Sequence, residues 1–587
     1  MALREKPVDV VLVGFGWAGA IMAQQLVGTG LSILALERGA VRHEPVDFAT
    51  TFDPDELRYV SRQTLLQTPA TSTITFRNNA GQRALPVRRF GAFLPGAGVG
   101  GAGVHWNAQI WRFQPSDLVA RSHLEARYGK AALEGLTIQD FPVTYDELEP
   151  YYTQFDRLVG TGGQAGNIRG EKQPGGNPFE GPRSEEFPNP PMRMTYGPTL
   201  FAEAARRLGH QPFPQPSGNM TRPWTNPLGA QLGQCTYCGF CEQFGCGNYS
   251  KASPQTTVIP WLLQKPNFAL RAESEVLKVE RTPDGRTATG VTYADRAGRE
   301  HFQPAGIVVL SAFQLHNVHL MLLSGIGQPY DPATGEGVVG RNFCYQTVSH
   351  VDAFFADKRI NPFIGAGALG MFIDEFNGDN FDHSGLGFVG GAGIGALLTN
   401  GRPIQTLPLP TGTPGWGLEW KHAAARWYNH SFSLVSQGTS YAQRGNYLDL
   451  DPTYRDQHGR PMMRMTFDFP PNDLRMSAFI TDRMAEIARE MGPASVTPLP
   501  RTGPFSVVPY QTTHLVGGTM AGRTPAGSVV NRYGQSWDVP NLFVTGANLF
   551  PQNAGYNPTA TLAAFAFMAA EAIRDRFARK PEPLVPL

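Results

Sequence analysis

The sequence predicts an α/β fold that begins with a parallel βαβ unit and contains at least one further domain. Residues 8–13 are apolar and mostly β-branched, which is typical of a buried parallel strand. A glycine-rich turn follows, then a helix-like stretch to Leu26, and then a second apolar strand over residues 32–36. At 587 residues the chain is too long for one ordinary domain, so a second, interleaved domain or long insertions must accompany this unit.

The composition indicates a large folded core with many ordered loops. Hydrophobic residues make up 41% of the chain, and with that apolar content the 66 Gly and 49 Pro indicate loops rather than disorder. The net charge of +1 offers no basic surface for nucleic acid or for an anionic membrane. The start of the chain lacks the features of a secretory signal, and no apolar stretch reaches about 18 residues. We therefore expect any membrane contact to come through partners.

Other segments can be assigned from their patterns. Residues 268–310 alternate in the manner of strands, residues 444–469 form a hairpin pattern, and residues 541–576 read as strand, loop and long buried helix. Residues 158–234 and 400–416 are rich in Gly, Pro and polar residues and are expected to form long loops. We find no internal repeat.

The glycine-rich turn has the G-x-G-x-x-G spacing of a dinucleotide-binding site. Gly14 permits the tight turn, Gly16 lets the backbone approach a pyrophosphate, and Gly19 packs the helix on the strand. Glu37 ends the second strand, where a carboxylate accepts hydrogen bonds from ribose hydroxyls. The alternative is a merely tight turn, but strand, helix and acid are all correctly placed for a nucleotide. The position of the fingerprint at the start of a long chain favours FAD over NAD.

A cluster of cysteines predicts an inorganic centre. Four of the five cysteines have the spacing C-x2-C-x2-C-x4-C: Cys235, Cys238, Cys241 and Cys246. Disulfides between residues three apart would be strained, and no C-x-x-C-H attaches haem c. An iron–sulfur cluster, zinc or uncoordinated thiols remain, and the spacing differs by one residue from a ferredoxin run. The fifth, Cys344, lies between Phe343 and Tyr345 and is expected to be a small buried hydrophobe.

Several motifs carry a family resemblance. Besides the fingerprint, GGAGVHWN at residues 100–107, LLSGIG at 322–327, HLVGGT at 514–519 and NPTAT at 557–561 occur in the order found in the glucose–methanol–choline (GMC) oxidoreductases. The resemblance covers nearly the whole chain. Within the family, the chain is most similar to the flavoprotein subunits of membrane-bound gluconate 2-dehydrogenases.

The resemblance implies a domain organisation. A Rossmann-like FAD-binding domain of the GMC type is expected to be discontinuous, and an α+β substrate-binding domain is expected to be interleaved with it. The expected FAD-binding segments are residues 1–125, 255–345 and 500–587. The expected substrate-binding segments are residues 126–254, with the cysteine loop at 235–246, and residues 346–499.

The resemblance also implies a catalytic pair, His514 and Asn557. Oxidation of a secondary alcohol requires removal of the hydroxyl proton while hydride leaves the same carbon, and a neutral imidazole with an ordinary pKa of about 6.5 suits that proton. An amide such as Asn557 orients the substrate oxygen without titrating. The alternative interpretation of His514 is an ordinary loop histidine.

Flavin contacts are implied as well. His105 resembles histidines joined covalently to the flavin 8α-methyl, and the alternative is a histidine that only packs beside the ring. Gly546 stands where many family members have Asp, so no side-chain contact is expected there. The full set expected to bind FAD is Gly14, Gly16, Gly19, Glu37, Gly100, Gly101, His105, Asn107, Gly546, Ala547, Asn548, Asn557 and Thr559.

The expected activity follows from these parts. His514 takes the proton of a sugar acid, D-gluconate by resemblance, hydride passes to FAD, and electrons leave through the cysteine cluster, implied to be a three-iron cluster. A cytochrome c subunit then passes them to quinone. The resemblance implies a heterotrimer at the periplasmic face of a bacterial inner membrane, exported by a signal on a small partner; without the partner we expect a cytoplasmic protein. Alternatives are a dehydrogenase of another polyol, ketose or glucoside, an oxygen-using oxidase, and a redox-inert binding subunit that holds zinc.

Overall fold

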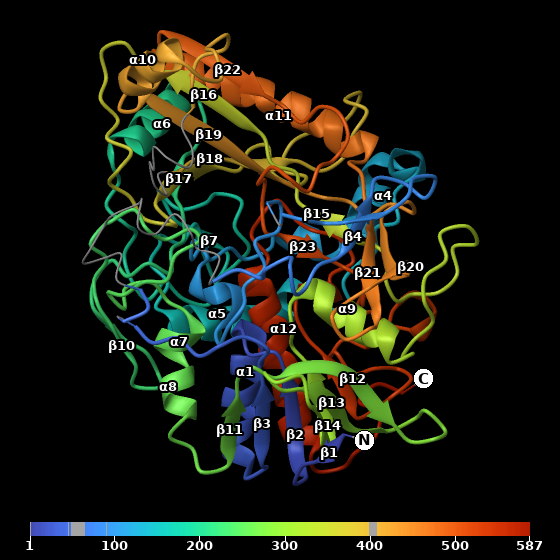
Figure 1. Ribbon diagram of the computed structural model, residues 1–587. Coiled ribbons are helices and arrows are strands. Elements are labelled where there is room, and N and C mark those ends of the chain that lie inside the picture. The colour runs from blue at the N-terminus through green and yellow to red at the C-terminus, as the bar shows by residue number, and fades with distance from the viewer. Residues whose placement is uncertain (1, 45, 49–64, 90, 398–407, 587) are drawn as a thin grey trace.

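The computed structural model describes residues 2–44, 46–48, 65–89, 91–397 and 408–586 (Figure 1). The lower half is built on an eight-stranded sheet of order β11-β3-β2-β14-β13-β12, with β1 and β24 also paired to β14. Its strands are β1 (Leu3–Arg4), β2 (Val8–Val13), β3 (Ile33–Leu36), β11 (Phe268–Arg271), β12 (Glu275–Arg281), β13 (Ala288–Ala294), β14 (Glu300–Leu310) and β24 (Leu542–Val544). The predicted α/β class and the N-terminal βαβ unit are confirmed.

The long strand β14 forms both antiparallel and parallel pairs with its neighbours. Its first half pairs antiparallel with β13, and its second half lies parallel to β2 on one side and to β24 on the other. Residues 308–310 of β14 are fully buried. This is the uninterrupted apolar pattern that a strand covered on both faces requires.

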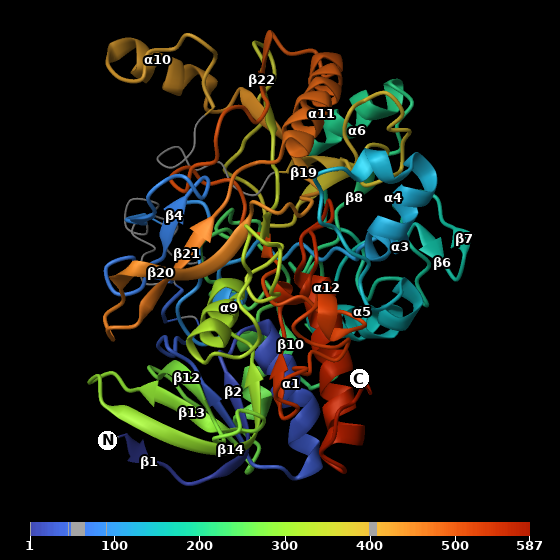
Figure 2. The ribbon, with the colours of Figure 1, turned by 90° about the vertical axis from the view of Figure 1, so that its right-hand side faces the viewer.

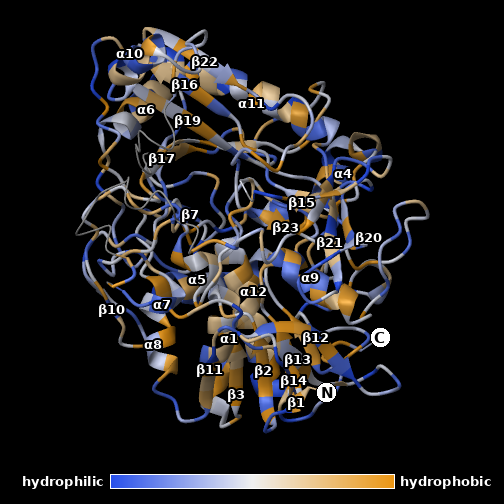
Figure 3. Cartoon of the chain, viewed as in Figure 1, coloured by the Kyte–Doolittle hydropathy of each residue, from blue (hydrophilic) through white to orange (hydrophobic). Residues whose placement is uncertain are grey.

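Helices cover this sheet from the side of α1 (Trp17–Leu26). The predicted C-terminal helix is α12 (Thr559–Ala572), which is apolar on nearly all sides and packs between α1 and α5 (Tyr145–Val159). Apolar residues run along α12 and the strands beneath it (Figure 3). A helix of this kind is stable only when it is surrounded by protein, so α12 is the centre of the lower core.

The upper half is an antiparallel six-stranded sheet of order β22-β16-β19-β18-β17-β8 (Figure 2). Its strands are β22 (Ser495–Leu499), β16 (His350–Phe354), β19 (Ser431–Gly438), β18 (Ala392–Leu397), β17 (Gly370–Ile373) and β8 (Phe213–Pro214). The amphipathic helices α11 (Pro471–Glu490) and α6 (Tyr196–Arg207) pack on it and on each other. Both chain termini lie in the lower half.

The two sheets draw their strands from the segments expected for the two domains, but other elements cross the expected boundaries. Helix α5 lies in the segment 126–254 and yet packs in the lower core, because its apolar side chains meet α12. Strands β4 (Thr75–Arg77) and β5 (Leu85–Pro86) belong to the segment 1–125 and yet form a four-stranded sheet with β20 (Tyr447–Arg455) and β21 (Pro461–Thr466). These two contacts therefore join segments expected to belong to different domains, and the exact domain boundaries stay a prediction.

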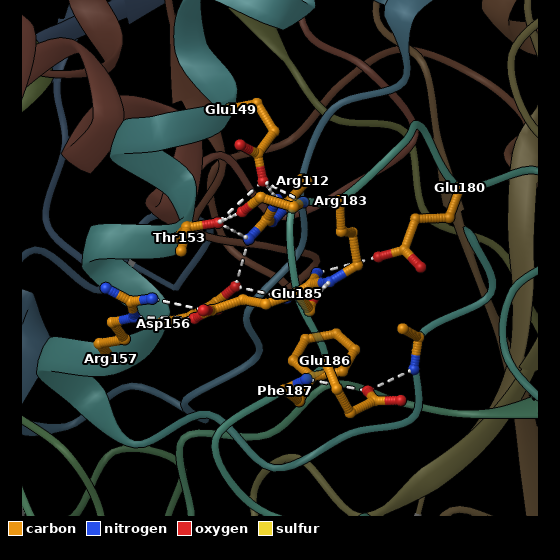
Figure 4. A network of polar contacts seen from close by, with 12 residues as sticks. Arg112, Glu149, Thr153, Asp156, Arg157, Glu180, Arg183, Glu185, Glu186 and Phe187 are labelled. Atoms are coloured by element: carbon orange, nitrogen blue, oxygen red, sulfur yellow. Dashed lines mark hydrogen bonds and ion pairs between the residues drawn. The ribbon is translucent and has the colours of Figure 1, made fainter. Parts of the chain in front are cut away.

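A buried ionic network holds α5 in place (Figure 4). Asp156 accepts hydrogen bonds at 2.7 Å from both Arg112 and Arg183, and Arg112 also pairs with Glu149 at 3.0 Å. Burial alone would raise the pKa of Asp156, but the two guanidinium groups hold this pKa below its ordinary value. The carboxylate of Asp156 therefore stays charged between two buried cations, whose other ion-pair partners are Glu149 and Glu180.

The remaining elements are short. The helices are α3 (Pro115–Leu118), α4 (Ala120–Tyr128), α7 (Pro254–Thr257), α8 (Ile259–Leu262), α9 (Gln314–Leu323) and α10 (Leu418–Trp427). The strands are β6 (Asn167–Ile168), β7 (Glu171–Lys172), β9 (Trp224–Thr225), β10 (Gln231–Leu232), β15 (Cys344–Tyr345) and β23 (Leu515–Val516). The predicted strands of 268–310 and the predicted hairpin β20–β21 are confirmed, whereas the loop expected at 158–234 also contains α6.

Part of the loop expected at 400–416 lies outside the described residues. Among the residues that are described, no helix is long and apolar enough to cross a membrane.

Candidate active site

A cavity of about 930 Å³ lies between the two halves. Its size is within the usual range for cofactor and substrate sites. Most residues expected to bind FAD line it: Gly14, Gly16, Glu37, Gly101, His105, Asn107, Gly546, Ala547, Asn557 and Thr559. Three residues of the expected set, Gly19, Gly100 and Asn548, lie behind this wall rather than on it.

The fingerprint glycines have separate structural roles. Gly14 has a φ of +88°, and a Cβ there would lie 2.6 Å from Ala312 Cα, so only glycine permits this turn. A Cβ on Gly19 would lie 2.4 Å from Gly14 O, which shows how closely α1 approaches β2. At Gly16 the nearest atoms would be 3.8 Å away, so the backbone is open toward the cavity at the N-terminus of α1.

Glu37 lies where a ribose-binding carboxylate is expected, at the end of β3. Its Oε2 accepts a hydrogen bond from the Phe15 amide at 3.0 Å, and its Oε1 accepts one from the Gly39 amide at 2.9 Å. Burial raises the pKa of this carboxyl. A carboxylate has about four acceptor positions, so two remain for a ligand.

The cavity wall at residues 105–107 fits the ring of a flavin. His105 is 4% exposed, and neither its Nε2 nor Asn107 Oδ1 has a hydrogen-bond partner within the described chain. Burial lowers the pKa of His105 to about 3, so its imidazole is neutral. Unpaired buried polar atoms are costly, and a heterocycle with hydrogen-bonding edges satisfies them. The residues present therefore fit FAD.

The loop at 545–548 is held by a buried amide. Asn548 is expected to bind FAD; its Nδ2 donates to Thr519 Oγ1 at 2.6 Å and its Oδ1 accepts from Asn317 Nδ2 at 2.8 Å. These two bonds hold the loop on which Gly546 and Ala547 face the cavity, and a contact of Asn548 with FAD stays a prediction. Gly546 has a φ of +122°, a conformation that side-chain-bearing residues rarely adopt.

The structure brings His514 and Asn557 together on the cavity wall. His514 directly precedes β23, which pairs with β15, so that Gln346 lies opposite His514. Asn557 lies just before α12. His514 Nε2 is 2.7 Å from Asn557 Nδ2, and His514 Nδ1 is 2.5 Å from Gln346 Oε1.

Hydrogen-bond logic fixes the tautomer of His514. The amide nitrogen of Gln346 donates to the carbonyl oxygens of Ala554 at 3.1 Å and Tyr556 at 3.2 Å. The Gln346 oxygen must therefore face His514, and His514 Nδ1 must carry the proton. It follows that Nε2 is the acceptor toward Asn557, which donates. Gln346 was not found from the sequence because no motif surrounds it.

The electrostatics of His514 suit a base. Burial lowers the pKa of His514 to about 3. The imidazole is therefore neutral at ordinary pH, with the Nε2 lone pair on the cavity side. Asn557 Nδ2 already engages this lone pair, so a substrate hydroxyl has to replace or share that hydrogen bond.

The cysteine loop lies directly behind the 105–107 wall. Gln243 N donates to His105 O at 2.7 Å, and the ammonium group of buried Lys251 donates to the carbonyls of Trp106, Cys241 and Phe244 at 3.0, 2.9 and 2.7 Å. The loop and the wall are thus one packed unit.

The four clustered thiols interact with one another without forming disulfides. Burial, and then neighbouring thiols, raise the pKa of Cys235. Polar nitrogens approach two of the sulfur atoms: Tyr237 N is 3.4 Å from Cys235 Sγ, and Asn219 Nδ2 is 3.8 Å from Cys241 Sγ. Cys344 is buried as expected, at 1% exposure.

Within the described ranges, no three His, Cys, Asp or Glu side chains are grouped so as to hold a single metal ion.

A dinucleotide fingerprint, a flavin-sized cavity and a neutral histidine with an amide partner together define a flavin-dependent oxidoreductase of alcohols. Two models of the GMC oxidoreductase family match residues 219–348 and 442–566. The chain belongs to the GMC oxidoreductase family, whose members are FAD enzymes acting on CH–OH groups. The fold and family expectations are thereby confirmed.

Similar proteins cover almost the whole chain. The gluconate 2-dehydrogenase flavoprotein of Pantoea cypripedii is 51% identical over 99% of this chain and 95% of its own length. A 2-methyl-1,2-propanediol dehydrogenase of Mycolicibacterium austroafricanum is 27% identical over 98% of this chain and 97% of its own. The crystal structure of pyridoxine 4-oxidase from Mesorbium loti shares the fold, with a TM-score of 0.57 and 15% identity over 97% of this chain and 99% of that one.

Proposed function

We propose that this protein is an FAD-dependent dehydrogenase that oxidises the secondary alcohol next to the carboxylate of a sugar acid, with D-gluconate as the substrate. The observation that carries the proposal is the neutral His514 whose Nε2 lies 2.7 Å from Asn557 Nδ2 on the cavity wall. The choice of substrate is supported by the 51% identity to the gluconate 2-dehydrogenase flavoprotein.

The residues of the chain divide the work as follows. His514 Nε2 accepts the proton of the substrate hydroxyl, and Gln346 keeps the other proton of the ring on Nδ1, so that Nε2 has the lone pair. The second N–H of the Asn557 amide orients the substrate oxygen. FAD, when bound, accepts the hydride from the substrate carbon.

Turnover of candidate substrates with an artificial electron acceptor tests the proposal. Gluconate should be oxidised with a higher kcat/KM than sorbitol, fructose or a glucoside. His514→Ala should abolish this activity with the flavin spectrum unchanged, while His422→Ala, at an exposed position of α10, should behave as the wild type. A higher kcat/KM for a neutral polyol than for gluconate contradicts the proposed substrate. Formation of hydrogen peroxide from oxygen at the same rate as substrate oxidation identifies an oxidase instead.

We further propose that the cysteine loop holds an iron–sulfur cluster, of the three-iron type, that takes electrons singly from the reduced cofactor. Support comes from the C-x2-C-x2-C-x4-C spacing, from the nitrogens directed at the sulfur atoms and from the contact between the loop and the 105–107 wall. Iron and acid-labile sulfide analysis with EPR spectroscopy tests it. Zinc in place of iron, or no metal at all, contradicts it.

A covalent bond between His105 and the flavin is also proposed. It is supported by the unpaired, buried Nε2 of His105 beside the cavity. After acid precipitation the flavin should remain with the wild-type protein and should appear in the supernatant for His105→Ala. Free flavin from the wild type contradicts the bond.

The proposed partners are a cytochrome c subunit, which passes electrons to quinone, and a small subunit that carries the export signal. The printed name of the Pantoea relative, a flavoprotein of a gluconate 2-dehydrogenase, supports further subunits. We propose the periplasmic face of the inner membrane as the working location. Co-purification tests the proposed partners, and fractionation of the source cells tests the proposed location. A chain that is recovered alone from the cytoplasm contradicts both proposals.

A further inference from the structure

Several amide side chains line the cavity that contains His514. Five of their oxygen atoms are buried and have no hydrogen-bond partner within the described chain: Asn107 Oδ1, Gln314 Oε1, Gln437 Oε1, Gln511 Oε1 and Asn557 Oδ1. Each is an acceptor that a bound molecule can satisfy only with a donor. A carboxylate offers no donor, whereas every hydroxyl group of a polyol offers one.

The orientation of the Gln437 amide is fixed by its neighbours. Trp111 Nε1 can only donate, and it lies 3.3 Å from Gln109 Oε1. The same oxygen is 3.0 Å from Gln437 Nε2, which must therefore be the nitrogen of that amide. A flip of Gln437 would place two oxygens against each other. Gln437 Oε1 is thus a buried, unpaired acceptor on a residue that lines the cavity.

Gln437 lies near the catalytic pair. It belongs to β19, and the chain beyond it runs beside residues 553–555, because Ser440 and Asn553 exchange backbone hydrogen bonds. A Cβ on Gly555 would lie 3.1 Å from Gln437 O, and Asn557 follows two residues later. Trp111 stacks on Tyr556 with ring centroids 5.0 Å apart, so the group that orients Gln437 also packs against the residue before Asn557.

We infer that Gln437 is a substrate-binding residue that accepts a hydrogen bond from a hydroxyl group close to the oxidised carbon, with Gln109 as the positioning residue that holds its amide. Gln437 is 6% exposed, so this acceptor is desolvated and a missing substrate hydroxyl leaves it unpaired. The inference rests on the proposed function for the identity of the substrate. It adds the requirement that the chain of the sugar acid carries a hydroxyl group at a defined position beyond the oxidised one.

Deoxygenated substrates test the assignment. With the wild-type enzyme, either 3-deoxygluconate or 4-deoxygluconate should have a kcat/KM about tenfold to a hundredfold below that of gluconate, the range expected for a buried acceptor that loses its donor. Gln437→Leu should lower the kcat/KM for gluconate by a similar factor. For this variant, the kcat/KM values for gluconate and for the affected deoxy analogue should agree within about threefold. Gln109→Leu should also weaken the discrimination.

Gln443→Leu is the matched control. Gln443 lies five residues after the end of β19, its Nε2 is 3.4 Å from Asp468 O, and it does not line the cavity, so wild-type discrimination should persist. The assignment is overturned if no deoxy analogue loses more than about threefold with the wild type, a result that needs no variant to fold. It is also overturned if a Gln437→Leu enzyme with a normal flavin spectrum keeps the discrimination. Failure of the wild type to oxidise any sugar acid overturns the proposed function instead, and the same comparison then uses the deoxy forms of the polyol that is turned over.

Discussion

Replacing Gln346 by Glu tests whether the amide of Gln346 sets the protonation of His514. In the native site the Gln346 oxygen lies 2.5 Å from His514 Nδ1, and burial holds the pKa of His514 at about 3. A carboxylate in the same place favours the imidazolium form, which is the wrong form for a base. The pKa of His514 therefore rises, and activity is lost as the pH falls through the raised pKa.

The expected shift follows from Coulomb's law. A unit negative charge about 4 Å from the imidazolium contributes about 4 kcal/mol at an effective dielectric constant of about 20. Since one pKa unit corresponds to about 1.4 kcal/mol, the pKa of His514 should rise by about 3 units, from about 3 to about 6. The wild type should show a level kcat/KM between pH 5 and 7, and Gln346→Glu should lose activity below about pH 6.

The assay is kcat/KM for gluconate against pH with an artificial acceptor, at constant ionic strength. The exposed Gln82, in the turn between β4 and β5, provides the matched control, and Gln82→Glu should keep the wild-type profile. The reasoning is refuted if Gln346→Glu binds flavin normally and its kcat/KM falls at low pH in the same way as that of the wild type. The reasoning is also refuted if Gln346→Glu has low activity at every pH and the acid side of its pH profile is not shifted. Gln346 would then act only through packing.

Three further outcomes are expected. His514→Ala should bind flavin with an unchanged absorption spectrum and lose at least about a hundredfold in kcat, and near-normal turnover would remove it from the role of base. Gly14→Ala should yield protein without flavin, because its φ of +88° and the close backbone behind it exclude a Cβ; flavin content measured by absorbance decides this. Asp156→Ala should lower the free energy of unfolding by about 3–5 kcal/mol in urea at pH 7, because buried Arg112 and Arg183 both lose a partner and keep only Glu149 and Glu180. The wild type should itself lose the contribution of Asp156 as the pH falls through its depressed pKa, and equal stability of the variant and the wild type at pH 7 would contradict the account.

The fold could be predicted from the sequence where the signal is local. The βαβ unit was recognised because apolar strands, glycine spacing and the terminal acid follow one another within residues 8–37. The joining of β4 to β21 could not be predicted, because Arg77 pairs with Thr466 across almost four hundred residues and neither strand has a distinctive pattern. Helix α11 is a different case, since Met476, Ile480 and Met484 recur at helical spacing and could have been read as a buried stripe.

The site was predicted where a motif surrounds the residue. His514 and Asn557 were found through family motifs, and the structure places them 2.7 Å apart. Gln346 and Gln437 could not be identified from the sequence because an isolated glutamine has no sequence signature. Their importance comes from which atom of the amide faces the cavity, and that depends on neighbours contributed by distant segments. The motif of Asn548 adjoins the cavity while its side chain bonds Thr519 and Asn317, so its contact with FAD stays a prediction.

The order in which the ribosome releases this chain has a consequence for how the enzyme is made. The first βαβ unit is complete by residue 36, yet β24 at Leu542–Val544 and the core helix α12 emerge only after roughly 500 further residues. At about 5–20 residues per second, the nascent chain spends between roughly half a minute and two minutes with helix α1 and the first strands of the sheet exposed, because the elements that cover them have not yet been made. Asn557 is also made after this interval, so the catalytic pair can form only when these late segments join the early ones.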